Sequence, residues 1–563
     1  MFNFTTRTTR LFYCYALDVK EVEKLDKFLE FLEKSGVSEI LNSVKESDQS
    51  KGNNQSDGGR TAYNPCHLFA TILYGFAFGK GSLREIESSC KFDLRYMYLM
   101  DYKQPAFKTF GNFINAYILP NYEKLFYKLM THMFHVMQVT MEDVFIDGTK
   151  IEADANKYKF VWKPTTYHLR LSDKIRTLLK EVGLDRGLPE KGIIDVKMVA
   201  SKLTEFHRMV ESCPEPDLKK RRKQYTELQQ YLEKSIEYTE KEMICGPDRN
   251  SYYKTDHDAT AMTLKTDYYS GLGSNMHAAY NIQIIVTKGL VAAYYVSQAR
   301  TDITELIPAL DKIHEFYGLY PTRVCADAGY GSLINYEYLE QNNIENYVKH
   351  QSWEGNVTGK RPVRYRLQGD GSIICLSGKT GSQVQLKDRH TKKAGNVFYR
   401  VEGCSDCAFS DYCKQWQNVK DEDFKIFEIN SEMVRYRQQA EENLLSVKGI
   451  EMRVNRSIQA EGAFGVVKQD MGYTRFRRTS IDKVRMEFAL TILGYNIRKL
   501  FKYFNGKWKG VCWKAPKDIE PEKFKKPSAK RLSNKVKKKQ QKSKNEEAKK
   551  SYKYKKRAEK TSS

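Results

Sequence analysis

Three acidic residues of this sequence lie in settings where carboxylates do chemistry. Asp147 ends the apolar run VFI, Asp327 ends the apolar run VCA, and a glycine-containing segment follows each. Active sites of α/β sheets gather at strand ends, so we expect both acids at one edge of a sheet. Glu461, the third, lies in the strongly basic segment RSIQAEGAFGVVKQDMGYTRFRR, residues 456–478. A single Asp after a strand is usually a turn or cap residue, and only the combination favours a site.

Three carboxylates in a basic setting suit phosphoryl transfer on a polynucleotide. Hard divalent cations take oxygen ligands, and negatively charged ligands offset the charge of the cation. Two Mg²⁺ ions about 3.5–4 Å apart stabilise the attacking and leaving oxygens of an in-line displacement. Carboxylates packed together repel one another unless a cation lies between them. The pattern therefore predicts that Asp147, Asp327 and Glu461 bind two Mg²⁺ or Mn²⁺ ions.

Basic and aromatic side chains near Glu461 predict contact with a polyanion. Lys468 lies two helical turns after Glu461, so both side chains share one helix face and Lys468 can reach a phosphate. The alternative is an ordinary surface Glu–Lys pair. Alternating basic and aromatic residues are typical of phosphate contact and base stacking; the segment KFVWKP, residues 159–164, is similar but less specific. The residues expected to contact nucleic acid are Tyr473, Arg475, Arg477 and Arg478, unless they form a solvated loop with Phe476 in the core.

Four cysteines in a polar, strand-rich segment predict a structural zinc site. Cys404 and Cys407 form a CxxC pair, Cys413 follows, and Cys375 lies upstream. Thiolates are the ligands that tetrahedral Zn²⁺ prefers, and the metal would stabilise a segment with little core of its own. A redox CxxC is the alternative, but this pair does not open a helix in a βαβ setting. The remaining cysteines are scattered, which excludes a disulfide framework.

Length and charge point to a folded chain with a polyanionic partner. The 563 residues carry a net charge of +24, and 40% of them are hydrophobic. Residues 523–563 alone contribute +15, which leaves +9 for residues 1–522. The basic tail predicts salt-dependent, sequence-independent nucleic-acid affinity, with a solubilising tail as the alternative. The longest apolar runs are far too short to span a membrane, and no signal peptide is expected.

Element patterns divide the chain into helical and mixed regions. Strand signals alternate with helices around 143–153, 278–297 and 322–348, which indicates a mixed α/β core with a turn at Asp147-Gly148. The expected regions are an N-terminal helical DNA-binding domain or scaffold (1–137), a catalytic core (138–164 and 247–350), a helical insert (165–246), a β-rich insert with the cysteines (351–428), a helical end of the core carrying Glu461 (429–510) and a basic disordered tail (511–563).

Three segments together resemble the catalytic blocks of a known family. FIDGTKIEA, VCADAGYGS and RSIQAEGAFGVVKQDMGYTRFRR resemble those of the DDE transposases of bacterial insertion sequences, nearest to the insertion-sequence-four-like superfamily. Upstream segments such as YNPCHLFATILYGFAFGKGSLREIE also resemble that branch, so the likeness extends over roughly residues 60–500. The resemblance implies an RNase H-like mixed sheet with helices on both faces, divalent-metal dependence, and Asp147, Asp327 and Glu461 as the acidic triad.

The third block departs from the family pattern at one position. The pattern is Tyr, two residues, Arg, three residues, Glu, six residues, Lys, and the gap from Glu461 to Lys468 keeps it. Four residues separate Arg456 from Glu461 where the pattern has three, and Arg453 stands where the tyrosine would be. Arg456 is therefore the weaker of the expected DNA contacts. Among the other acids, Asp302 could hold an active-site loop, although a helix N-cap is the favoured role.

The resemblance implies a function in DNA transposition. The helical N-terminal domain would bind the terminal inverted repeats, and the core would cut DNA at the element ends and join the freed 3′-hydroxyl to target DNA. Such an enzyme is expected to act as a homodimer on two DNA ends, in the bacterial cytoplasm at the nucleoid. Two alternatives stay open: a metal-dependent nuclease without strand transfer, and a catalytically inactive DNA-binding regulator derived from a transposase.

Overall fold

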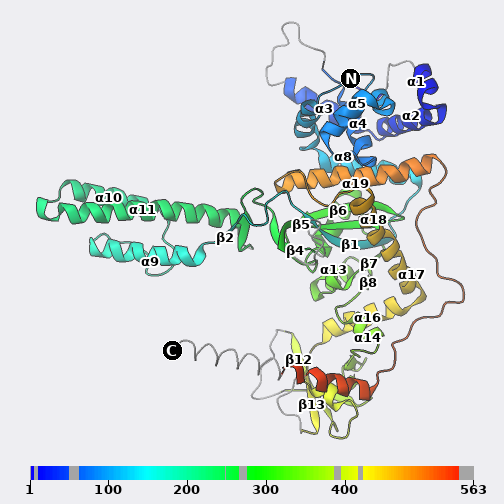
Figure 1. The fold of residues 1–563 in the computed structure, drawn as a ribbon. Helices are drawn as coiled ribbons and strands as arrows, with labels where there is room; N and C mark the ends of the chain where they lie inside the picture. Colours follow the sequence, from blue (N-terminus) through cyan, green and yellow to red (C-terminus); the bar gives the residue numbers. More distant parts are fainter. Residues whose placement is uncertain are drawn as a thin grey trace, which may run out of the picture.

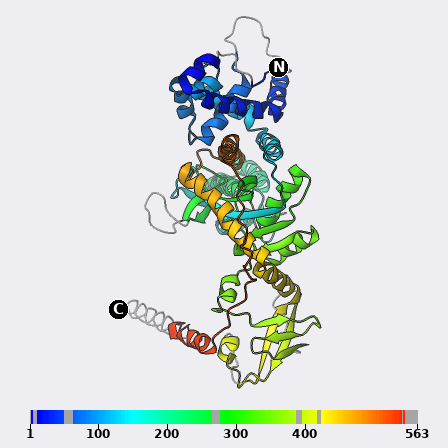
Figure 2. The same cartoon turned by 90° about the vertical axis from the view of Figure 1, so that its right-hand side faces the viewer.

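A mixed sheet at the centre of the molecule connects three peripheral parts (Figure 1). N-terminal helices lie on one side of it, a helical arm projects sideways, and a β-rich unit lies at the opposite end, as the rotated view also shows (Figure 2). The structure is a computed structural model, and it describes residues 2–4, 10–49, 62–247, 249–264, 276–385, 395–415, 422–539 and 541–543.

The central sheet has antiparallel and parallel halves. Its strands are β1 (Asp143–Glu152), β4 (Thr260–Thr263), β5 (Met276–Thr287), β6 (Leu290–Ser297), β7 (Arg323–Ala326) and β8 (Glu345–Val348). β5 pairs antiparallel with β1 on one edge and with β4 and β6 on the other. β1, β7 and β8 follow one another as parallel neighbours. The fold is thus mixed α/β, compatible with the predicted RNase H-like core.

β1 runs straight through the position where a turn was expected. Asp147 pairs with Ile284 and Gly148 with Gln283, within an unbroken ladder between β1 and β5. The prediction of a turn at Asp147-Gly148 was therefore wrong. The glycine meets a packing demand instead: a β-carbon at Gly148 would lie 2.6 Å from Gln283 Oε1 and 2.9 Å from the Tyr330 hydroxyl.

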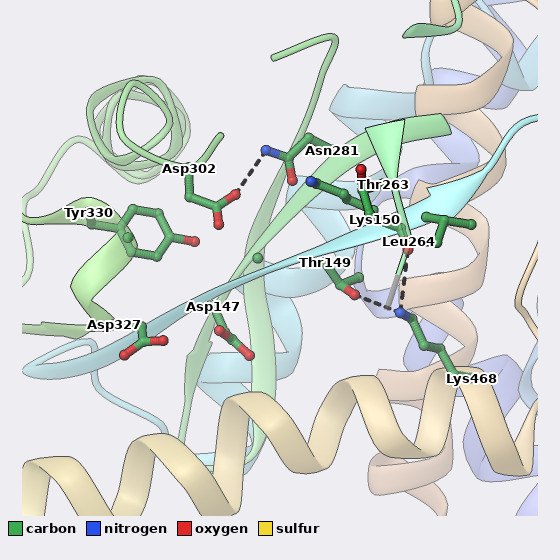
Figure 3. A pocket seen from close by; sticks show the side chains of 12 residues that line it. Asp147, Thr149, Lys150, Thr263, Leu264, Asn281, Asp302, Asp327, Tyr330 and Lys468 are labelled. Atoms are coloured by element: carbon green, nitrogen blue, oxygen red, sulfur yellow. Dashed lines mark hydrogen bonds between the residues drawn. The ribbon is translucent and has the colours of Figure 1, made fainter. Parts of the chain in front are cut away.

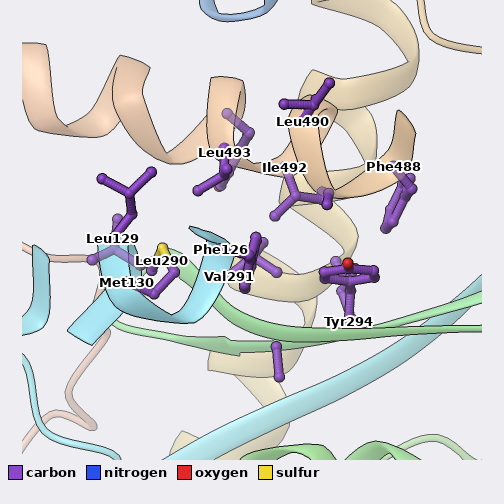
Figure 4. Packing of buried hydrophobic residues seen from close by; sticks show 14 of the residues in the cluster. Phe126, Leu129, Met130, Leu290, Val291, Tyr294, Phe488, Leu490, Ile492 and Leu493 are labelled. Atoms are coloured by element: carbon purple, nitrogen blue, oxygen red, sulfur yellow. The ribbon is translucent and has the colours of Figure 1, made fainter. Parts of the chain in front are cut away.

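Helix α19 (Ile481–Phe504) lies between the sheet and the N-terminal helices. Figure 4 shows its apolar side chains packed against β6 and against α8 (Tyr122–Met137). Its other main neighbour is α4 (Pro65–Ala77), and a β-carbon at Gly494 would lie 2.7 Å from the backbone carbon of Phe76. The remaining N-terminal helices are α1 (Arg10–Leu17), α2 (Val19–Lys34), α3 (Val37–Gln49), α5 (Leu83–Phe92), α6 (Leu94–Leu99), α7 (Phe107–Phe113) and the π-helix η1 (Ile114–Ile118).

One hydrophobic core runs from the N-terminal helices through α19 into the sheet. Buried residues of both regions, such as Phe28 and Val144, belong to the same cluster. Burial of these side chains removes apolar surface from water, and it couples the stability of the N-terminal helices to that of the sheet. The N-terminal region is therefore built onto the core and does not have a separate hydrophobic interior.

The helical arm consists of α9 (Thr165–Glu181), α10 (Val196–Glu211) and α11 (Glu215–Cys245), which share a core of their own. Its base is a two-stranded sheet of β2 (Phe160–Trp162) and β3 (Ser251–Tyr253). Buried His168 ties α9 to α11, because its ring nitrogens lie 3.0 Å from Glu242 Oε2 and 3.1 Å from Ser235 Oγ. Satisfied buried polar groups of this kind fix the pairing of helices.

The β-rich unit is an antiparallel sheet in the order β13–β12–β11–β10–β9, with its own small core. Its elements are α14 (Trp353–Val357), β9 (Tyr365–Leu367), β10 (Ile373–Cys375), β11 (Thr380–Val384), β12 (Asn396–Glu402), α15 (Ser410–Lys414) and β13 (Phe424–Asn430). Helix α16 (Ser431–Leu445) then packs on β8 and β9 and leads the chain back to the central sheet.

The basic tail is not disordered throughout, which corrects the sequence-based expectation for residues 511–563. Residues 529–539 form a helix. Leu532 and Val536, one turn apart on this helix, are 2% and 7% exposed, and Ser533 Oγ donates to Asp411 Oδ2 at 2.6 Å. An apolar pair at helical spacing can bury itself against the β-rich unit even in a Lys-rich segment. Residues 544–563 lie outside the described part of the chain.

Candidate active site

Parallel pairing of β1 and β7 brings two of the predicted acids together. Phe145 of β1 pairs with Cys325 of β7, and Asp147 and Asp327 each lie two residues further along. Asp327 directly follows the last residue of β7, as predicted, whereas Asp147 lies inside β1. Figure 3 shows both carboxylates on the same side of the sheet, toward the helix that carries Lys468.

The third acid comes from an irregular helix that crosses this sheet edge. Helix α17 (Val447–Arg456) continues into the π-helix η3 (Ser457–Glu461), the short α18 (Gly462–Gly465) and a second π-helix, η4 (Val466–Asp470). Both α17 and η3 contact β1. Helical structure was predicted for residues 456–470, but the two π-segments were not. Glu461, at the end of η3, is half-exposed.

Arg456 joins the acids from the two elements. Its guanidinium donates to Asp147 Oδ1 at 3.2 Å and to Glu461 Oε1 at 2.7 Å. The Arg456 side chain is only 8% exposed, so water screens these ion pairs weakly. The residue that the family pattern made least certain is therefore the one that connects Asp147 with Glu461, two of the three candidate acids.

Burial and mutual repulsion shape the ionisation of the site. Burial raises the pKa of Asp147 to about 6; the Arg456 guanidinium opposes that rise, and the carboxylates of Glu461 and Asp327 add to it. Burial would lower the pKa of Arg456, but the carboxylates of Asp147, Asp327 and Glu461 raise it. The acids thus affect one another electrostatically, and a positive charge is held among them.

A cavity of about 390 Å³ opens beside the acids (Figure 3). Its walls come from β1, from the segments after β4 and β7, from β5 and from η4. The lining residues are Asp147, Gly148, Thr149, Lys150, Thr263, Leu264, Asn281, Asp302, Asp327, Gly329, Tyr330 and Lys468. Glu461 is not among them, and it reaches Asp147 through Arg456.

Lys468, the basic residue expected to contact a phosphate, lines the cavity. Its ammonium group donates to Thr149 Oγ1 at 2.6 Å and to the Lys150 carbonyl at 3.4 Å (Figure 3). These contacts hold the Lys468 ammonium along β1, at the cavity that Asp147 also lines. A basic group in such a position can contact a phosphate that enters the cavity.

Asp302 is a further acid of the cavity, and the preferred sequence interpretation of it was wrong. Helix α12 (Leu306–Tyr317) has Glu305 as its N-cap. The Asp302 carboxylate instead accepts hydrogen bonds from Asn281 Nδ2 at 2.8 Å and Gln283 Nε2 at 3.0 Å. Asn281 and Gln283 are fully buried. Polar residues inside the apolar strand NIQIIV were the signal that could have located them from the sequence.

The segment after η4 does not form the predicted base-stacking surface. Tyr473 is 7% exposed and packs edge-on against Phe476, itself 1% exposed, so neither ring can stack on a base. Burial raises the pKa of Tyr473 well above its usual value. Arg475 pairs with Asp154 at 3.0 Å, and Arg478 lies 4.0 Å from buried Glu487. The aromatic rings are buried in the core, and Arg475 and Arg478 face acidic side chains. Arg477 is therefore the exposed basic side chain of this segment.

The four cysteines of the β-rich unit line one small cavity of about 20 Å³. Burial raises the pKa of Cys413 to about 11, and the neighbouring thiols of Cys407, Cys375 and Cys404 add to that rise. Among the residues that the structure describes, no group of three or more His, Cys, Asp or Glu side chains has the geometry of a metal site. Among these described residues, neither the four thiols nor the acids beside β1 form such a group.

Comparison with known proteins identifies two regions of the chain. The family "Transposase DDE domain" matches residues 374–501, and the family "Transposase domain (DUF772)" matches residues 18–116. Two regions of the chain thus match transposase families, and one of the two is a DDE domain family. The first match includes Arg456, Glu461 and Lys468, while Asp147 and Asp327 lie outside it.

Other comparisons add no further relatives to this transposase-type chain. No curated protein and no solved structure matches it. Within the described residues, every helix is too short or too polar to cross a lipid bilayer.

Proposed function

We propose that this chain is the transposase of an insertion sequence, which binds the terminal inverted repeats, cuts DNA there and transfers the freed strand to a target. The observation that carries the proposal is the register of β1 and β7, which sets Asp147 beside Asp327 and under the helix of Glu461. The transposase families that match residues 18–116, in the N-terminal helical region, and residues 374–501 support it. The assignment to the insertion-sequence-four-like superfamily belongs to the same proposal.

Asp147, Asp327 and Glu461 would hold divalent cations. Their oxygens are the donors that Mg²⁺ and Mn²⁺ prefer, and the Arg456 guanidinium already stands in for a cation between two of them. When bound, such ions activate the attacking oxygen and stabilise the leaving oxygen of a phosphodiester. Lys468 would contact a phosphate of the DNA in the cavity, and Asp302 would hold the β5 polar residues in place beneath it.

The base of the helical arm offers a further DNA-contacting surface. Tyr158, Trp162 and Tyr167 are 79%, 65% and 63% exposed, and Lys157, Lys159 and Lys163 lie among them in the sequence. Exposed aromatic rings next to basic groups suit stacking on unpaired bases and phosphate contact. In this proposal these aromatics take the role that the sequence assigned to Tyr473.

The acidic triad is tested by single neutral substitutions. Asp147→Asn, Asp327→Asn and Glu461→Gln should each lower Mn²⁺-dependent cleavage of DNA carrying the element ends by at least about 10³-fold, because each removes a cation ligand. Binding of the same DNA should persist. Glu142→Gln, an exposed acid just before β1, is the matched control and should cleave normally. Normal cleavage by one triad variant would remove that residue from the mechanism.

Strand transfer separates the proposal from its alternatives. A precleaved end with a free 3′-hydroxyl should be joined to target DNA by the wild-type chain in the presence of Mn²⁺. Cleavage without joining would identify a nuclease, and end binding without either reaction would identify an inactive regulator. Because two ends must be held together, the active complex is proposed to be a homodimer at the nucleoid.

We also propose that Cys375, Cys404, Cys407 and Cys413 bind a structural Zn²⁺. Their common cavity and the soft thiolate donors support this, and binding would require the side chains to move into tetrahedral geometry. The purified chain should contain about one zinc per molecule. Cys407→Ser should lose the metal and lower the melting temperature, whereas Cys512→Ser, an exposed cysteine elsewhere, should keep both. Wild-type protein without zinc would refute the proposal.

A further inference from the structure

The π-helix η3 places Arg456 and Glu461 on the same side of the helix. In a regular α-helix, residues five apart lie about 140° apart around the axis, so their side chains point in different directions. A π-turn is wider, with hydrogen bonds from residue i to i+5, and residues five apart then nearly overlie. The 2.7 Å contact between Arg456 and Glu461 follows from this turn. The π-turn therefore accommodates the one residue by which the spacing from Arg456 to Glu461 exceeds the family pattern.

Neighbouring elements hold the π-turn in place. Gln459, inside the turn, accepts a hydrogen bond from the Gly289 amide at 2.9 Å and donates to the Val511 carbonyl at 2.7 Å. Asn455, just before the turn, donates to the Trp513 carbonyl at 2.9 Å. The turn is thus anchored to the β5–β6 connection and to the segment after α19, which fixes the helix backbone that carries Arg456 beside β1.

Arg456 competes for the carboxylate oxygens that a cation would need. It contacts one oxygen of Asp147 and one oxygen of Glu461, while Ser457 Oγ donates to the other oxygen of Glu461 at 3.0 Å. A divalent cation bound by the same carboxylates would meet a buried positive charge within a few ångströms. Like charges at such distances in a poorly solvated site repel strongly.

We propose that Arg456 is a positioning residue that acts as a resident cation: it holds Asp147 and Glu461 together, and divalent cations bind by displacing it from at least one of them. This inference rests on the proposed metal-dependent function. It means that the affinity of the site for metal is set by a balance between repulsion among the acids, which favours the cation, and competition from Arg456, which opposes it.

The test compares the charge of residue 456 with the affinity for Mn²⁺. Arg456→Gln removes the charge but keeps hydrogen-bond donors, and Arg456→Lys keeps the charge without the two-pronged guanidinium. Mn²⁺ binding to the full-length protein is measured by calorimetry, and the melting temperature is recorded in EDTA and in saturating Mn²⁺. Arg323→Gln is the control outside the cavity, since Arg323 pairs with Asp143 at the start of the same strand.

Arg456→Gln should bind Mn²⁺ about tenfold more tightly than wild type, because the competing charge is gone. The melting temperature of this variant should be lower than that of wild type in EDTA and should rise more when Mn²⁺ is added. The reason is that stabilisation by a bound ligand increases with its affinity. Arg456→Lys should bind Mn²⁺ nearly as wild type does. Arg323→Gln should lower both melting temperatures equally, which is the result expected for a residue that acts only on the fold.

Equal or weaker Mn²⁺ affinity in Arg456→Gln than in Arg456→Lys would overturn the proposal. If Arg456→Gln does not fold, Arg456→Met compared with Arg456→Lys provides the same contrast of charge. Failure of the underlying function has a different signature: the wild-type melting temperature would not respond to Mn²⁺, or Asp147→Asn would respond just as wild type does. The two failures are therefore distinguishable.

Discussion

At the scale of single residues, the candidate site consists of charged side chains whose burial and mutual repulsion are energetically unfavourable. Asp147 is mostly buried, faces two other carboxylates, and is partly compensated by one guanidinium. A buried carboxylate in such surroundings favours its neutral form. In the proposed function, a cation bound at Asp147 would offset both the repulsion from the other carboxylates and the burial penalty of the charged form.

The raised pKa of Asp147 predicts the pH dependence of stability in EDTA. Because its pKa in the folded chain is about 6, above the usual 3.8, the carboxyl stabilises the fold most below about pH 4, and this contribution disappears as the pH rises through 6. Wild-type protein should therefore lose about 2 kcal/mol relative to Asp147→Asn between pH 4 and pH 7.5. Melting curves in EDTA check this; a constant difference across that range would contradict it.

At the scale of elements, β1 and the helix from α17 to η4 determine the site. β1 supplies Asp147, and Gly148 next to it leaves room for Gln283 and Tyr330 beneath the cavity. The helix supplies Arg456, Glu461 and Lys468, and its two π-segments rotate these side chains toward the sheet edge. Irregular helix geometry is common at functional sites because it re-aims side chains without breaking the helix.

Close packing between α19 and α4 predicts different effects for two helical glycines. A β-carbon at Gly494 would meet backbone atoms of Phe76 and Ala77 within 3 Å, so Gly494→Ala should destabilise the chain by about 1–3 kcal/mol. Nothing lies within 4 Å of a β-carbon at Gly465, so Gly465→Ala should be neutral or stabilise by up to about 1 kcal/mol.

Thermal unfolding of both glycine variants beside wild type is the measurement. A melting temperature of Gly494→Ala at or above that of Gly465→Ala would show that the α19–α4 contact is looser than the structure indicates. The position of Gly465 also shows that the glycines after Glu461 do not serve contact with the sheet, since the space beside it is open.

At the scale of the whole molecule, long-range contacts hold together parts that are distant in the sequence. α19 comes late in the sequence and yet packs on α4 and α8 of the N-terminal region and on β6, so one core extends across both regions. Figure 4 shows its contacts with α8 and β6. The arm and the β-rich unit have cores of their own and attach to the edges of this body (Figure 1). The cavity beside β1 lies in the shared body, between β1, β5 and the helix that ends with η4.

The sequence by itself selected the three acids and Lys468 as candidate site residues and indicated the mixed α/β class and the family resemblance, because residue type, apolar runs and motif spacing are local properties. Only the tertiary structure decided that Asp147 lies inside a strand, that Tyr473 is buried, that Asp302 joins the cavity, and that a basic tail segment docks as a helix. It also decided the contacts of Arg456 with Asp147 and Glu461, because Gln459 in the π-turn after Arg456 is held by Gly289 and Val511. Such contacts join residues far apart in the chain, and spacing along the sequence carries no record of them.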